Sequence, residues 1–307
     1  MPAIPTLAAL ASMPVPASPP ATQMPTATPT PSPTVTPTPT LTPTPTLTPT
    51  PVCRTPGRIE TGYYPSLVDG PQRAYRIYLP PCYGQDGRVY PTLYLLHGNG
   101  QDESKWDSVG IDEAADQGVF DGSLPPMIIV MPAGNWAMYH TSGGPGSFEA
   151  VIVDYLIPYI DAAYCTWRVP AARAIGGISR GGYWALEIAF RHPTEFASVG
   201  GHSAALLDIA AGPDLNPQYT GLTHGLGALR VYLDAGANDL GILVNLQQLH
   251  EDMVNASIPH EWHLNEGGHD DAYWRSQSAN YLAWYAAPWS PDRQQYPPCR
   301  QLSPDAH

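Results

Sequence analysis

Gly177-Ile178-Ser179-Arg180-Gly181 is the most informative stretch of this chain, because it has the pattern G-x-S-x-G. A short apolar run, 174–178, precedes the serine, and a run typical of a helix, 182–191, follows it. A strand, a sharp turn and a helix in this order form a nucleophile elbow, which exposes one serine hydroxyl above a sheet. The pattern therefore predicts an α/β sheet with Ser179 as its nucleophile.

The first 52 residues contain no charged side chain, and from Thr26 to Pro51 they are almost entirely threonine and proline. Proline removes backbone donors and fixes φ, so this segment cannot build a packed core. We expect residues 1–52 to be a disordered, extended spacer that works as a passive tether. Its mildly apolar start, 3–13, is either a truncated signal peptide or the product of a misassigned start codon. Residues 53–307 then form one domain with a full core.

Charge and cysteine content narrow the classes of partner and compartment. The net charge of −13 argues against nucleic acid and anionic membranes as partners. No run of 18 apolar residues occurs, so we expect no membrane-spanning helix. No cysteine pair has metal-ligand spacing, so we expect no metal site. Catalysis by a serine nucleophile needs no organic cofactor, and none is expected. Four cysteines beside such a spacer favour an oxidising, extracellular compartment and two disulfides, against the alternative of four free thiols. Three connectivities are open, and we favour Cys82–Cys165 with Cys53–Cys299.

The remaining pattern alternates between strands and helices. Such alternation predicts a mostly parallel sheet with helices on both faces, and the first two strands form a hairpin that adds antiparallel edge strands. The predicted strands are 58–64, 73–79, 92–96, 127–131, 174–178, 196–200, 229–234 and 260–264. The predicted helices are 103–117, 148–164, 182–191, 241–256 and 271–286.

The strand at 92–96 ends in His97-Gly98-Asn99-Gly100. Functional groups of such sheets gather at the carboxyl ends of the strands. We expect the backbone N–H groups of Asn99 and Arg180 to form an oxyanion hole above Ser179. The alternative is an ordinary turn at the end of a strand.

An acyl-transfer serine needs a base, and the base needs an acid that orients it. Chain order in this fold is serine, acid, histidine. Asp239 is the predicted acid, because it lies beyond a glycine in the loop after the strand, whereas Asp234 lies on the strand and is predicted to be structural. Asp239 could instead cap the next helix. His269, after two glycines at the end of the last strand, is the predicted base.

Four stretches in this order, 90–98, 177–183, 236–239 and 267–270, resemble the esterase-D-like "putative esterase" family of α/β-hydrolases. The family includes feruloyl and acetylxylan esterases, S-formylglutathione hydrolases and mycolyltransferases, and the resemblance spans about residues 58–286. It implies an α/β-hydrolase fold with Ser179, Asp239 and His269 as the triad. Arg180 departs from the family, where methionine is commoner. Its charge either favours an anionic acyl group or pairs with a nearby carboxylate, and we prefer the second interpretation.

We therefore expect an exported serine esterase that acts through an acyl-enzyme, on feruloyl or acetyl esters of plant cell-wall polysaccharide. Trp136 and Tyr139 follow the fourth strand and are predicted to border the cleft, unless they are core or scattered surface residues. Two alternatives stay open. One is an acyltransferase of the mycolyltransferase type, and the other is a non-catalytic surface module that keeps the fold as a scaffold.

Overall fold

The computed structural model describes residues 55–206 and 211–300, and the predicted spacer and Cys53 lie outside these ranges. Within them, no helix has both the length and the apolar character that crossing a membrane requires.

One eight-stranded sheet forms the centre of the fold, with the strand order β1-β2-β4-β3-β5-β6-β7-β8. The hairpin strands β1 and β2 are antiparallel to their neighbours, and every other pairing is parallel. The predicted α/β-hydrolase sheet with an antiparallel edge is therefore confirmed. The strands are β1 (Arg58–Pro65), β2 (Gln72–Leu79), β3 (Thr92–Leu96), β4 (Ile128–Pro132), β5 (Arg173–Ile178), β6 (Ser198–His202), β7 (Arg230–Gly236) and β8 (Glu261–Asn265).

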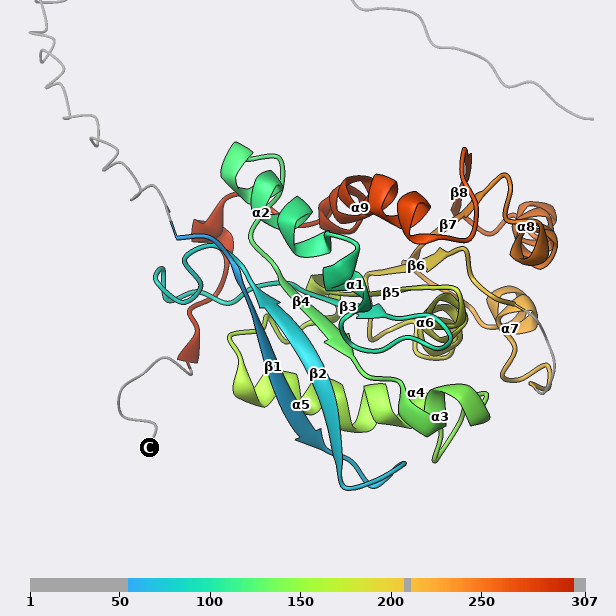
Figure 1. Ribbon diagram of the computed structural model, residues 1–307, viewed down its shortest axis with the longest axis horizontal. Helices are drawn as coiled ribbons and strands as arrows, with labels where there is room; N and C mark the ends of the chain where they lie inside the picture. The colour runs from blue at the N-terminus through green and yellow to red at the C-terminus, as the bar shows by residue number, and fades with distance from the viewer. Residues whose placement is uncertain (1–54, 207–210, 301–307) are drawn as a thin grey trace, which may run out of the picture. The chain divides into compact units, whose positions relative to one another are not determined.

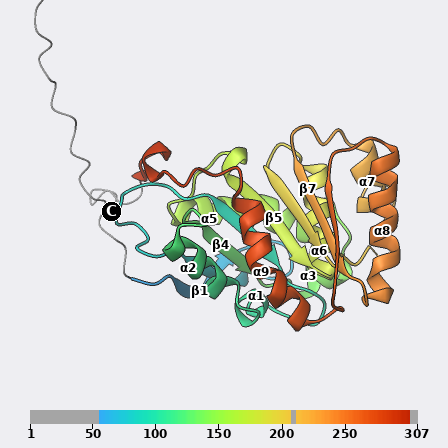
Figure 2. The ribbon, with the colours of Figure 1, turned by 90° about the horizontal axis from the view of Figure 1, so that it is seen from above.

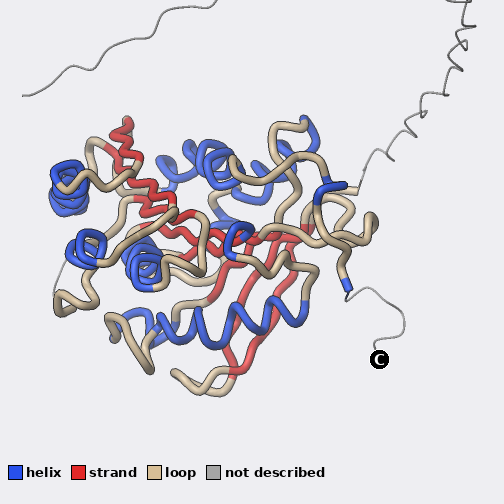
Figure 3. Tube along the Cα trace, turned by 180° about the vertical axis from the view of Figure 1, so that it is seen from behind, coloured by secondary structure: helices blue, strands red, loops and turns tan. Residues whose placement is uncertain are grey.

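Helices cover both faces of the sheet, as Figure 1 and the view from behind in Figure 3 show. Seen from above, α9 crosses over the sheet, and α8 lies at the side away from α2 (Figure 2). The helical elements are α1 (Lys105–Ser108), α2 (Ile111–Asp121), α3 (Asn135–His140), α4 (Phe148–Ala150), the π-helix η1 (Val151–Leu156), α5 (Ile157–Ala163), η2 (Pro170–Ala172), α6 (Arg180–Arg191), α7 (Pro217–Thr223), α8 (Leu240–Asn255), α9 (Asp271–Ala286) and η3 (Arg293–Gln295).

The central strands are buried on both faces, which explains their continuous apolar sequences. Alternate residues of β3 pack into two separate cores: Leu93 and Leu95 face α1, α2 and α9, whereas Tyr94 and Leu96 face α5 and α6. Because β3 to β8 run parallel, their carboxyl ends lie at one edge of the sheet, where the functional loops begin.

Two predicted helices are interrupted. The helix expected at 103–117 is divided into α1 and α2 by Gly110, whose φ of 84° is left-handed. The helix expected at 148–164 consists of α4, the wider π-helical turn η1 and α5. Pro158 lies just after that turn, and its missing N–H cannot continue a regular hydrogen-bond ladder.

The strand expected at 196–200 begins two residues later, and α3 was not predicted.

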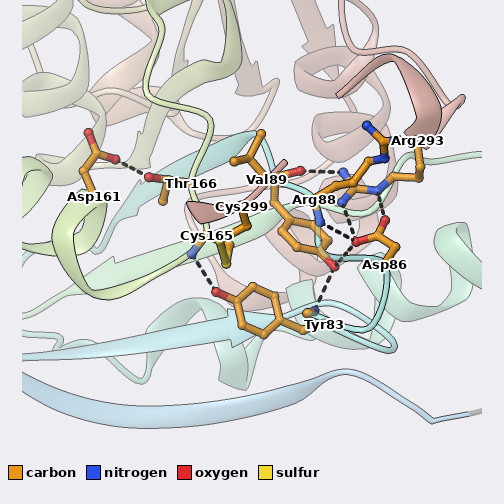
Figure 4. Close-up of a disulfide and its surroundings, with 11 residues drawn as sticks. Tyr83, Asp86, Arg88, Val89, Asp161, Cys165, Thr166, Arg293 and Cys299 are labelled. Atoms are coloured by element: carbon orange, nitrogen blue, oxygen red, sulfur yellow. Dashed lines mark hydrogen bonds and ion pairs between the residues drawn. A yellow bond between two sulfur atoms is a disulfide. The ribbon is translucent and has the colours of Figure 1, made fainter. Parts of the chain in front are cut away.

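Both predicted disulfides are wrong, because Cys165 is bonded to Cys299 (Figure 4). Cys82 is also disulfide-bonded. The chain after α9 runs back along the loop that precedes β3, with Cys299 N–H donating to Gly87 O (2.7 Å) and Val89 N–H donating to Pro297 O (3.0 Å). Those backbone contacts bring Cys299 beside Cys165, and no sequence pattern reveals them.

The elbow helix α6 carries a buried glutamate, Glu187, whose side chain is fully enclosed. Burial raises the pKa of Glu187 well above its ordinary value, and the nearby Glu149 carboxylate raises it further. Burial alone would also raise the pKa of Glu149, but hydrogen bonds from His192, Gly144 and Arg191 outweigh it and lower that pKa to about 2. Arg191 Nε lies 3.3 Å from Glu187 Oε1 and opposes this rise, but burial and the Glu149 charge outweigh it and favour the protonated form of Glu187.

Glu187→Gln is predicted to gain stability relative to the wild type, and this gain grows as the pH rises. The pKa of this carboxyl group is higher in the folded than in the unfolded state, so its contribution to the stability of the fold depends on pH. The contribution is complete below the unfolded pKa, about 4.5, and is lost as the pH rises towards the folded pKa. The neutral amide has no such loss. Melting temperatures of the wild type and Glu187→Gln between pH 5 and 8 should therefore diverge.

The exposed Glu251→Gln on α8 is the control and should show no divergence. A constant difference between wild type and Glu187→Gln across this range would show that Glu187 is ionised in the folded state.

Candidate active site

Ser179 lies in the turn between β5 and α6 with φ 55° and ψ −118°, a conformation that non-glycine residues rarely adopt. Hydrogen bonds hold it there. Its N–H donates to His202 O (3.0 Å), and its carbonyl accepts from Tyr183 N (3.1 Å) and Ala205 N (2.9 Å). The turn can form only because Gly181 follows it, since a Cβ at that position would lie 2.3 Å from Leu96 O.

Ser179, His269 and Asp239 form a continuous hydrogen-bonded chain. Ser179 Oγ lies 2.9 Å from His269 Nε2, and His269 Nδ1 lies 2.6 Å from Asp239 Oδ2. The Asp239 carboxylate is almost entirely buried, whereas 32% of the His269 side chain is exposed. Asp239 occupies the N-cap position of α8 without capping it through its side chain, so its carboxylate is directed to the imidazole. This arrangement can deprotonate the serine and stabilise the resulting imidazolium.

The loops that carry the acid and the base are joined by their backbones. Ala237 N–H donates to Asn265 O (2.7 Å), and Asn238 N–H donates to Gly267 O (2.9 Å). The loops approach so closely at Gly236 that a Cβ there would lie 2.5 Å from Gly267 O. Asp239 and His269 are thus positioned by the same pair of loops.

Asp234 and the two histidines near the last strand, His260 and His263, have other surroundings. Asp234 is fully buried on β7, where it accepts hydrogen bonds from His202, Tyr273 and Tyr281. It does not contact His269. His260 bonds His250, and His263 stacks on Tyr232, so neither reaches Ser179.

Asn99 and Arg180 line the pocket that contains Ser179, and within the described ranges neither backbone N–H donates a hydrogen bond. Both can therefore donate to an oxygen bound above the serine. His97 fixes the first of these loops: its Nδ1 donates to Gly98 O (2.8 Å), and its Nε2 accepts from Gly134 N (2.7 Å). Burial lowers the pKa of His97 and favours the neutral imidazole that this pair of bonds requires.

The preferred interpretation of the Arg180 side chain is wrong. Its Nε and Nη2 donate to the backbone carbonyls of Met138 (3.1 Å) and Thr141 (2.9 Å), and no carboxylate of the described residues pairs with it. The guanidinium also lies over the ring of Tyr183, 4.8 Å from its centroid. Arg180 thus anchors the segment after β4 to the elbow helix. The sequence could not show this, because the acceptors are main-chain carbonyls.

The pocket above Ser179 has a volume of about 860 Å³. Tyr139 lines it and donates from its hydroxyl to Gln101 O (3.0 Å). Trp136 does not line it; this side chain is 56% exposed on α3 and stacks on His140. Sequence reasoning missed seven other residues of the wall, although four of them lie within five residues after the predicted base: Gln101, Ala205, Ile242, Asp270, Asp271, Ala272 and Trp274.

Two glycines near Asp239 offer a matched test of the close approach between the loops. Gly236→Ala is predicted to lower the unfolding free energy by about 1–3 kcal/mol, because the new methyl group meets the backbone of the neighbouring loop. Gly241→Ala, in open space in the first turn of α8, should leave stability unchanged or raise it by up to about 1 kcal/mol. Urea unfolding measures both. Equal effects of the two substitutions would contradict this packing.

Comparison with known proteins places the chain among esterases. The family described as "Putative esterase" matches residues 70–285. An esterase of Mycobacterium tuberculosis is 29% identical over 241 residues, covering 63% of this chain and 51% of the relative. An endo-1,4-beta-xylanase/feruloyl esterase of Xylanibacter ruminicola is 34% identical over 153 residues, covering 47% of this chain and 21% of the relative. The chain thus spans about half the length, or less, of these relatives.

Solved structures agree on the fold. A ferulic acid esterase is 25% identical, with a TM-score of 0.69 over 76% of this chain and 98% of that protein. The fluorophosphonate-binding serine hydrolase F of Staphylococcus aureus is 18% identical, with a TM-score of 0.65 over 75% of this chain and 99% of its own length. With the family match covering more than half of the sequence, this chain belongs to the putative esterase family and has its α/β-hydrolase fold.

Proposed function

We propose that this protein is a serine esterase that hydrolyses carboxylic esters through an acyl-enzyme. The hydrogen-bonded chain Ser179–His269–Asp239 at the floor of an open pocket is the observation that carries the proposal. Membership of the esterase family and the names of the relatives support the same reaction.

In the first half of the reaction, Ser179 Oγ attacks the ester carbonyl carbon while His269 Nε2 takes its proton. Asp239 accepts from His269 Nδ1, which keeps the other nitrogen free as the base and stabilises the charge of the imidazolium. The negative charge on the carbonyl oxygen is stabilised by the N–H groups of Asn99 and Arg180, each typically worth about 3 kcal/mol in the transition state. The C–O bond then breaks, and the alcohol leaves with the proton from His269.

In the second half, water enters the pocket and loses a proton to His269. The resulting nucleophile attacks the acyl carbon, and Ser179 Oγ leaves with the proton returned by the imidazole. The exposure of the His269 side chain gives water access to the site.

Feruloyl or acetyl esters of plant cell-wall polysaccharide are the substrates we propose. A relative named as a xylanase/feruloyl esterase and a structure named as a ferulic acid esterase favour this class. The wall formed by Tyr139, Trp274 and Ile242 offers the flat and apolar contacts that an aromatic acyl group needs. The Cys165–Cys299 disulfide and the Thr/Pro-rich sequence of residues 1–52 support export, with that segment as the tether.

An acyltransferase remains the second candidate, because hydrolysis and transfer share the same acyl-enzyme. The pocket, with a volume of about 860 Å³, has room for an alcohol acceptor as well as for water. A non-catalytic module is disfavoured, since such a protein has no need for an intact hydrogen-bonded triad.

Ser179→Ala is expected to lower kcat for p-nitrophenyl acetate by on the order of 10⁶ while leaving the melting temperature within a few degrees of the wild type. The substitution removes the nucleophile and leaves the packing of the elbow intact. The same two proteins, assayed on methyl ferulate, acetylated xylan and S-formylglutathione with and without a sugar acceptor, separate the substrate classes and distinguish transfer from hydrolysis. Near wild-type turnover by Ser179→Ala would refute the proposed nucleophile.

A further inference from the structure

Below the triad lies a second histidine–aspartate pair that the reaction does not use. His202 ends β6 and Asp234 lies on β7, and both side chains are fully buried. His202 Nδ1 lies 2.7 Å from Asp234 Oδ1. Unlike His269, this imidazole cannot reach a substrate, so a role in catalysis has to act through other residues.

Asp234 is an acceptor for three donors. Besides His202, the hydroxyl groups of Tyr273 (2.5 Å) and Tyr281 (2.7 Å) both donate to its Oδ2. A carboxylate can accept all three, whereas an amide has one acceptor oxygen and two N–H groups that need acceptors of their own. A buried polar group is tolerated only when it is hydrogen-bonded in this way. The surroundings of residue 234 therefore require an aspartate.

One side of this network holds the nucleophile. The backbone carbonyl of His202 accepts from Ser179 N (3.0 Å), and Ser203 N–H donates to the backbone carbonyl of Asp234 (2.8 Å). Ser203 has a φ of 45°, so the end of β6 is conformationally strained next to the strained elbow. The hydrogen bond between His202 and Asp234 fixes the end of β6, where the His202 carbonyl accepts a hydrogen bond from the amide of Ser179.

The other side holds the loop of the base. Tyr273 lies in the first turn of α9, and its hydroxyl also accepts from Asn265 Nδ2 (3.1 Å), at the end of β8. Gly267 lies directly against the ring, since a Cβ there would be 2.6 Å from Tyr273 Cδ2. The loop from Asn265 to His269 is thus wrapped over Tyr273, which is itself anchored to Asp234.

We propose that Asp234 is a positioning residue that fixes the nucleophile elbow and the base loop relative to one another, with Tyr273 as its contact to the base loop. This inference rests on the proposed function in one respect, because the geometry that Asp234 maintains is that of the Ser179–His269 pair. It assigns to the buried aspartate a role in kcat in addition to its role in packing.

The two tyrosines provide a matched test. Tyr273→Phe and Tyr281→Phe each remove one hydroxyl from the same oxygen of Asp234, but only Tyr273 touches the base loop. We expect Tyr273→Phe to lower kcat for p-nitrophenyl acetate by roughly 10- to 100-fold with KM changed less than about twofold, the effect of a small misplacement of reacting groups. Tyr281→Phe should lose a similar amount of thermal stability and keep kcat within about twofold.

A readout without turnover keeps this test separate from the test of the reaction. The proton between His269 Nδ1 and Asp239 should give a downfield ¹H NMR resonance in the wild type, identified by its absence in Asp239→Asn. We expect it to be broadened or lost in Tyr273→Phe and retained in Tyr281→Phe.

If the wild type hydrolyses no ester, the proposed function fails and the resonance still decides the positioning role. Equal losses of kcat in the two variants, no loss in either, or a resonance unchanged in Tyr273→Phe would each overturn the proposal for Asp234.

Discussion

The close approach of β3, β5 and α6 around Ser179 is the constraint on which the rest of the site depends. At Gly177 and Gly181 a Cβ would lie 2.3 Å from backbone atoms, so the strand, turn and helix can meet only through glycine. This packing forces Ser179 into a left-handed conformation that costs on the order of 1–3 kcal/mol, which the hydrogen bonds to its amide and carbonyl offset. This conformation directs the Ser179 hydroxyl away from the sheet, within hydrogen-bond distance of His269 Nε2.

Two histidine–aspartate pairs of the same chemistry lie at this edge of the sheet, and their surroundings give them different roles. His269 is partly exposed and touches the serine, so its proton can move during a reaction. His202 is fully buried, and its Nε2 lies 2.9 Å from the hydroxyl of Tyr285 on α9. Its hydrogen bonds are therefore fixed. In our proposal the buried pair fixes the strand ends, and the pair at Ser179, in which only His269 is partly exposed, depends on that geometry.

Much of the fold was predictable because its signals are local. Continuous apolar strands, turn glycines and the pentapeptide at Ser179 identify the sheet and its functional edge, and chain order singles out Asp239 and His269. The failed predictions of the disulfides and of the Arg180 contacts depend on contacts between distant segments. The Cys165–Cys299 bond follows from the path of the chain after α9, and the Arg180 contacts follow from carbonyls presented by the segment after β4. Neither the disulfide nor the Arg180 contacts can be recognised from the pattern of side chains in the sequence.

We propose above that the elbow serine is a nucleophile activated by its histidine. Labelling with a fluorophosphonate, followed by peptide mapping, tests it most directly, because the reagent records which hydroxyl is activated independently of the natural substrate. We expect one adduct, on the peptide that contains Ser179, formed at least 100-fold more slowly in His269→Ala. An adduct on another residue, or the same rate in His269→Ala, would contradict it.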